Sequence, residues 1–101
     1  MSNTPPANLR RSEREPAHFP VSLVLRAQSR QTAYEASTID LSLGGASVET
    51  YLELVPGEWV GIVPKSGFPF AIPSRVVWVR PKDTLGTFYL AGLQFLNTLP
   101  V

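Results

Sequence analysis

From His18 onward, hydrophobic and polar residues alternate along most of the chain. A period of two is typical of β-strands that bury one face and leave the other in solvent. The clearest case is the segment 19–27, whose apolar face carries Phe19, Val21, Leu23 and Leu25, with Ser22 and Arg26 on the other face. In the next segment, Tyr34, Ala36 and Thr38 share one face. The pattern therefore predicts strands and no amphipathic helix.

Six strands are predicted, separated by short segments rich in Gly and Pro. They cover residues 19–27, 31–39, 46–54, 58–63, 71–80 and 87–96. Ten prolines spread along the chain also disfavour long helices, because proline lacks the backbone N–H that an interior helical position needs. Residues 18–101 are therefore expected to form an all-β domain, a small six-stranded antiparallel barrel whose closure limits exposed strand edges.

The first 17 residues have a different character. They are polar or charged, without apolar periodicity, and are interpreted as a flexible arm preceding the barrel. The arm is rich in arginine, with Arg10, Arg11 and Arg14 set against Glu13 and Glu15. A charged segment of this kind is usually a solvated tail, unless a site in the folded domain uses its arginines.

Composition excludes several classes of function. The chain has 101 residues, a formal net charge of +1, no cysteine and one histidine. That length fits a single domain, and the lack of cysteine excludes disulfides, thiolate metal clusters and a cysteine nucleophile. A single histidine disfavours a histidine metal site or a catalytic triad, so we expect no metal, no catalytic residues and no enzymatic activity. The near-neutral charge argues against nucleic-acid binding, and without a long apolar run we expect a cytoplasmic protein that does not insert into membranes.

A glycine-containing turn is predicted between the second and third strands. It reads Asp40-Leu-Ser42-Leu-Gly44-Gly45, and the paired glycines are expected to supply positive φ angles. Taken alone, Asp40 and Ser42 are ordinary turn residues, since their side chains commonly hydrogen-bond to nearby backbone.

Three features together resemble the PilZ domain family. They are the arginine-rich arm, the Asp40-x-Ser42-x-x-Gly45 turn and the closing strand Ala91-Gly-Leu-Gln-Phe95. The resemblance extends from about Arg10 to Asn97. It implies a bacterial, non-enzymatic receptor for the second messenger cyclic di-GMP, bound as one molecule or as an intercalated dimer.

The residues of these motifs suit that ligand. The guanidinium group of an arginine can donate two hydrogen bonds to the O6 and N7 acceptors of guanine, and its plane can stack on the purine. The Asp40 carboxylate can accept hydrogen bonds from the guanine N1–H and N2–H donors, and the Ser42 hydroxyl can reach a phosphate or ribose. Gly45 would let the backbone approach the ligand without a Cβ in the way. Ordering of the arm over the ligand would then pass the signal to an unidentified effector protein.

The arginine motif can be aligned in two ways. One places it at Arg10 and Arg14, with Arg11 as an additional arginine, and the other places it at Arg14 and His18. In the second alignment a neutral imidazole replaces a charged guanidinium group. This replacement would weaken binding by about 1–3 kcal/mol, or about ten- to a hundredfold. The candidate ligand-binding residues are therefore Arg10, Arg11, Arg14, His18, Asp40, Ser42, Gly44 and Gly45.

A second hypothesis is also compatible with the sequence. A degenerate PilZ-like adaptor would bind a protein partner and no nucleotide, and the histidine of the second alignment is compatible with that. Trp59 and Trp78 both lie in apolar runs and are interpreted as residues of the core or rim rather than of the site.

Overall fold

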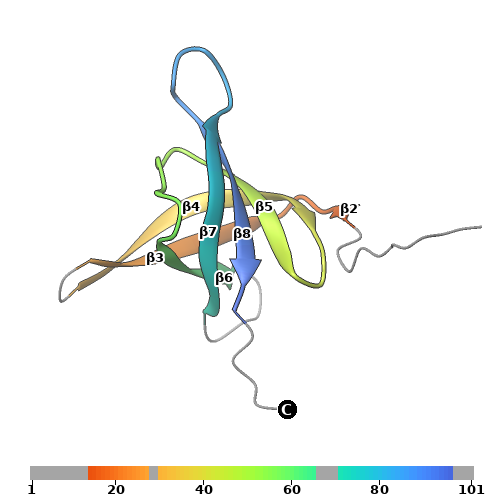
Figure 1. The fold of residues 1–101 in the computed structure, drawn as a ribbon, viewed down its shortest axis with the longest axis vertical. Helices are drawn as coiled ribbons and strands as arrows, with labels where there is room; N and C mark the ends of the chain where they lie inside the picture. The colour runs from red at the N-terminus through yellow and green to blue at the C-terminus, as the bar shows by residue number, and fades with distance from the viewer. Residues whose placement is uncertain (1–13, 28–29, 66–70, 97–101) are drawn as a thin grey trace, which may run out of the picture.

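The computed structural model describes residues 14–27, 30–65 and 71–96, and all of its regular elements are β-strands. The strands are β2 (Glu15–Pro16), β3 (Pro20–Ala27), β4 (Arg30–Leu41), β5 (Gly45–Thr50), β6 (Trp59–Pro64), β7 (Ile72–Pro81) and β8 (Tyr89–Phe95). Six of them form a closed antiparallel barrel, and the two-residue β2 lies beside the β4–β5 hairpin (Figure 1). Among these residues, no helix is long and apolar enough to cross a membrane.

The barrel closes through β4, which pairs with β3 on one side and with β5 on the other. From β3 the sheet continues through β6, β7 and β8 and returns to β5. The predicted six-stranded antiparallel barrel is confirmed. Most strand ends lie within two residues of the predicted ones, and the largest difference is in β5, which ends at Thr50 rather than at residue 54.

The predicted alternation of buried and exposed positions holds where the strands cross the barrel. Val21 and Leu23 are fully buried, and Ala36 and Thr38 face the interior from β4. Phe19, by contrast, is 37% exposed, since it precedes the first residue of β3 at the rim of the barrel. The core thus lies along the barrel axis, and the ends of the hairpins are free to form a site.

The described part of the predicted arm is attached to the barrel. Glu15 lies opposite Leu41 and Pro16 opposite Asp40 in the β2–β4 register, and the Ala17 N–H donates to the Ile39 carbonyl at 3.0 Å. The buried Thr38 hydroxyl reinforces the connection, because it accepts from the Phe19 N–H at 3.0 Å and donates to the Ala17 carbonyl. The position of Arg14 is therefore set by the pairing of β2 with β4.

Candidate ligand-binding site

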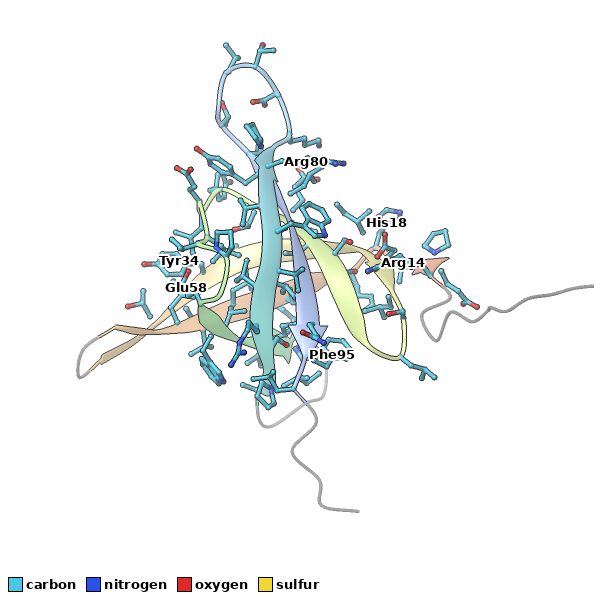
Figure 2. All side chains as sticks on the ribbon, in the orientation of Figure 1. Arg14, His18, Tyr34, Glu58, Arg80 and Phe95 are labelled. Atoms are coloured by element: carbon cyan, nitrogen blue, oxygen red, sulfur yellow. The ribbon has the colours of Figure 1, made fainter. Side chains whose placement is uncertain are left out.

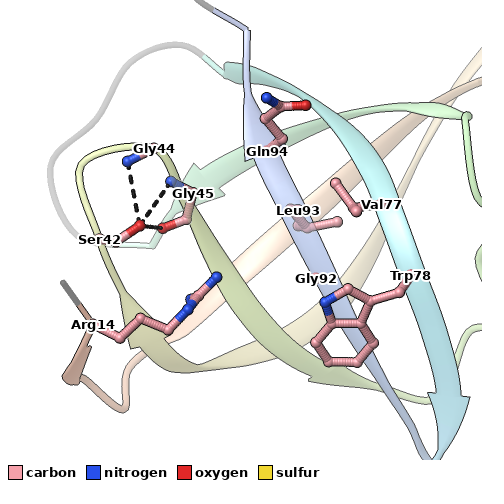
Figure 3. Close-up of a pocket in the computed structure, with 9 residues that line it drawn as sticks. All are labelled: Arg14, Ser42, Gly44, Gly45, Val77, Trp78, Gly92, Leu93 and Gln94. Atoms are coloured by element: carbon pink, nitrogen blue, oxygen red, sulfur yellow. Dashed lines mark hydrogen bonds between the residues drawn. The ribbon is translucent and has the colours of Figure 1, made fainter. Parts of the chain in front are cut away.

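The β4–β5 turn is closed by its own serine. The Ser42 hydroxyl accepts from the N–H groups of Gly44 and Gly45 at 3.2 and 3.1 Å (Figure 3). The Ser42 N–H in turn donates to the Gly45 carbonyl at 2.9 Å. Such a side-chain-to-backbone turn is the ordinary role of serine in this position. It also fixes the direction of the hydroxyl and of the two glycine N–H groups.

The glycines of this turn serve a different purpose from the one predicted. Neither Gly44 nor Gly45 has a positive φ, so the expectation of left-handed backbone here is wrong. A Cβ on Gly45 would lie 2.1 Å from the Leu93 carbonyl oxygen, because β8 runs directly against this position. Glycine is therefore required at residue 45 by the close approach of two strands.

Arg14 and Asp40 form an ion pair at the junction of β2 and β4. The side chains of Arg14 and Asp40 are 44% and 25% exposed, so both remain accessible to a ligand. Strand pairing brings them together, since Pro16 is the register partner of Asp40. Both residues are candidates from the sequence, and the structure places them in contact.

A pocket of about 270 Å³ opens between the β4–β5 turn and strands β7 and β8. Its wall consists of Arg14, Ser42, Gly44, Gly45, Val77, Trp78, Gly92, Leu93 and Gln94 (Figure 3). Four of these nine were candidates from the sequence. The remaining five come from the distant strands β7 and β8, which the barrel brings against the turn.

Trp78 is the main residue that the sequence interpretation missed. It is half-buried and lies on Gly92, where a Cβ would be 2.1 Å from the indole Nε1. The β7–β8 register shifts between Val76 and Trp78, and Trp78 then pairs with Gly92. The signal that could have found it is the glycine of the closing strand, since an interior strand glycine often marks a close approach.

A second pocket of about 280 Å³ adjoins the first. Arg14 and Trp78 line both pockets, and the second is completed by Ile39, Asp40, Ser47, Arg80 and Leu90. The Arg80 guanidinium lies 5.2 Å from the centre of the indole ring, within cation–π range. The two pockets together present two guanidinium groups, one carboxylate and one aromatic ring.

The candidate residues thus fall into four groups. Arg14, Ser42, Gly44 and Gly45 line the first pocket, and Asp40 lines the second. His18 is exposed on the connection between β2 and β3 and lines neither pocket (Figure 2). Arg10 and Arg11 lie outside the described residues. No group of three His, Cys, Asp or Glu residues that could hold a metal ion occurs in the described ranges.

The sequence matches the PilZ domain model over residues 8–101. The chain belongs to the PilZ domain family. Its structure is similar to that of the PilZ domain, with c-di-GMP, of YcgR from Escherichia coli, with a TM-score of 0.65 and 20% sequence identity. That match covers 91% of this PilZ chain and 81% of the YcgR chain, and it confirms the fold. A comparison with curated proteins found no match.

Proposed function

We propose that this PilZ domain binds cyclic di-GMP in the two adjoining pockets on either side of Arg14 and Trp78. One observation carries the proposal: Arg14, which directly precedes β2, lines the same pocket as the Ser42–Gly45 turn and Trp78 of β7, although these three are far apart in sequence. Membership of the PilZ family supports it, as does the fold shared with a c-di-GMP-containing domain.

The side chains are complementary to a guanine nucleotide. A guanidinium has five N–H donors, so Arg14 can keep its ion pair with Asp40 and still donate to guanine O6 and N7. Asp40 has acceptor positions left for the N1–H and N2–H donors. The exposed faces of Trp78 and Arg80 offer a stacking surface, and the positive charges suit the phosphates.

The domain is proposed to act as a receptor that relays the concentration of the nucleotide to an effector protein. Arg10 and Arg11 precede Arg14 by only a few residues, so they are within reach of a ligand held there. Their ordering over the ligand would change the surface that the effector contacts. The stoichiometry of a nucleotide titration distinguishes one bound molecule from an intercalated dimer.

Isothermal titration with cyclic di-GMP tests the proposal. The wild-type chain is compared with Arg14→Ala and with Arg75→Ala, which removes an exposed arginine of β7 that lines neither pocket. We expect saturable binding by the wild type and by Arg75→Ala. Loss of a charge-assisted, bidentate contact in Arg14→Ala should weaken binding by about tenfold to a hundredfold.

Two results would contradict the proposal. The first is no heat at several hundred micromolar nucleotide, with no change in the NMR signals of Arg14 or Trp78. The second is equal weakening by both arginine variants, which would indicate nonspecific attraction of an anion. Either result would favour the alternative function, an adaptor that binds a protein partner and no nucleotide.

A further inference from the structure

The β4–β5 turn has a second concave surface, distinct from the nucleotide pockets. A groove of about 290 Å³ is lined by Glu15, Pro16, Ala17, Leu41, Ser42 and Leu43. We call this the turn groove. It shares only Ser42 with the first pocket and no residue with the second. Apart from Glu15 and Ser42, its lining side chains are apolar.

Leu43 stands at the edge of the turn groove with 92% of its surface exposed, more than any other large hydrophobic residue in the described ranges. The hydrogen bonds that close the turn use Ser42, Gly44 and Gly45, so the conformation does not depend on a leucine at position 43. A single exposed leucine is common, but one beside an apolar groove extends that groove into a larger apolar surface. This is the arrangement expected where another molecule covers the turn.

The charge on the rim indicates the chemistry of that molecule. The three ion pairs among the described residues join Arg14 to Asp40, Lys65 to Glu35 and Lys82 to Glu49, and Glu15 belongs to none of them. Glu15 is exposed, so its carboxylate is available beside the apolar lining. We propose that the turn groove docks a segment of a partner protein that presents an apolar side chain next to a Lys or Arg. The apolar side chain packs against Pro16, Leu41 and Leu43, and its basic neighbour faces Glu15.

Strand β2 links this groove to the nucleotide site. Arg14 lines both nucleotide pockets, and the next three residues form one wall of the turn groove. A nucleotide held by Arg14 fixes β2 against β4 and so preserves the groove, which raises the affinity for the partner. This link rests on the proposed function, whereas the docking surface itself does not.

The test uses a displayed library of random twelve-residue peptides as the probe. The library is selected on the full chain saturated with cyclic di-GMP, and the enriched peptides are titrated into variants by fluorescence anisotropy. Leu43→Ser removes the apolar edge of the groove. The matched control is Leu85→Ser, which removes a leucine that is 84% exposed on the β7–β8 loop. Glu15→Lys reverses the charge on the rim.

The enriched peptides should contain an apolar residue adjacent to Lys or Arg. We expect them to bind the wild type and Leu85→Ser alike, and to bind Leu43→Ser about tenfold or more weakly, as loss of a buried leucine contact implies. Glu15→Lys should weaken the binding of these peptides, and exchanging the basic residue of the peptide for Glu should restore binding to that variant. Binding that Leu43→Ser leaves unchanged, or no enrichment of peptides, would overturn the proposal.

Two further measurements separate this proposal from others. Nucleotide titration of Leu43→Ser should match the wild type, so a failure of the groove and a failure of the nucleotide site give different results. Sedimentation with phosphatidylcholine–phosphatidylglycerol vesicles tests a lipid surface as the occupant. Vesicle binding that requires Leu43, without peptide binding, would show that the turn meets a membrane and would refute a protein partner.

Discussion

At the scale of single residues, Gly92 and Trp78 are packed closely against each other in the wall of the site. A Cβ at residue 92 would overlap the indole, whereas a Cβ at Gly44 meets no atom within 4 Å. We expect Gly92→Ala to lower the free energy of unfolding by about 1–3 kcal/mol through overpacking, and to weaken nucleotide binding by displacing Trp78. Urea denaturation and titration with cyclic di-GMP measure the two effects. Gly44→Ala is the control for stability alone, since Gly44 also lines the first pocket, and equal stability of the two variants would show that the indole does not depend on Gly92.

Tyr89 is a residue whose ionisation the fold perturbs. Loss of hydration raises its pKa above the usual 10.0, and the charge of Glu53, a 3.4 Å hydrogen bond to Glu53 and the charge of Asp83 act in the same direction. Because the folded state holds the proton more tightly, this contribution to stability is complete below pH 10 and is lost as pH rises through the folded pKa. In an alkaline titration followed by absorbance, Tyr89 of the Glu53→Gln variant should lose its proton at a lower pH than Tyr89 of the wild type. An unchanged midpoint would exclude Glu53 as a cause.

The sequence could predict those site residues that belong to a local motif. Asp40, Ser42 and Gly45 stand within six consecutive positions, and Arg14 belongs to both possible arginine alignments. Trp78 could not be assigned, since an aromatic residue in an apolar run has the same pattern whether it faces a core or a pocket. Only the β7–β8 register, with its shift beside Trp78, places the indole in the site.

At the scale of elements, the connection between β2 and β3 depends on Thr38. Its side chain is 2% exposed and bonds to both Ala17 and Phe19. Thr38→Val keeps the shape and removes these bonds, so it should destabilise the domain by about 1–3 kcal/mol. Since β2 also positions Arg14, affinity for cyclic di-GMP should fall as well. Chemical denaturation and calorimetry test both, with Thr32→Val on the exposed part of β4 as control. A stable variant with normal affinity would show that β2 keeps its position without the Thr38 hydroxyl.

Long strands were predictable and the shortest one was not. Alternation identified β3 and β4, although β4 extends further than predicted, and β7 lies within one residue of its predicted bounds. Strand β2 has two residues, one of them Pro16, and two residues carry no periodicity. Its existence follows from its pairing with β4, which is a long-range contact that local sequence does not encode.

At the scale of the whole molecule, stability and binding are separable at core positions that lie away from the site, although Leu93 belongs to both. Leu23 is fully buried on β3 and lines neither nucleotide pocket. Leu23→Ala should cost about 2–5 kcal/mol of unfolding free energy, while the fraction that remains folded binds cyclic di-GMP normally. Thermal unfolding with and without nucleotide measures both quantities. A large loss of affinity at full folding would indicate that the barrel transmits strain to the pockets.

The position of Trp78 also makes the domain its own spectroscopic probe. The chain has two tryptophans, and Trp59, on β6, lines neither nucleotide pocket. In a Trp59→Phe variant, all indole emission would come from Trp78, which lines both pockets together with Arg14. A purine stacked on that ring would quench the emission, and cyclic di-GMP could then be followed in real time without any label.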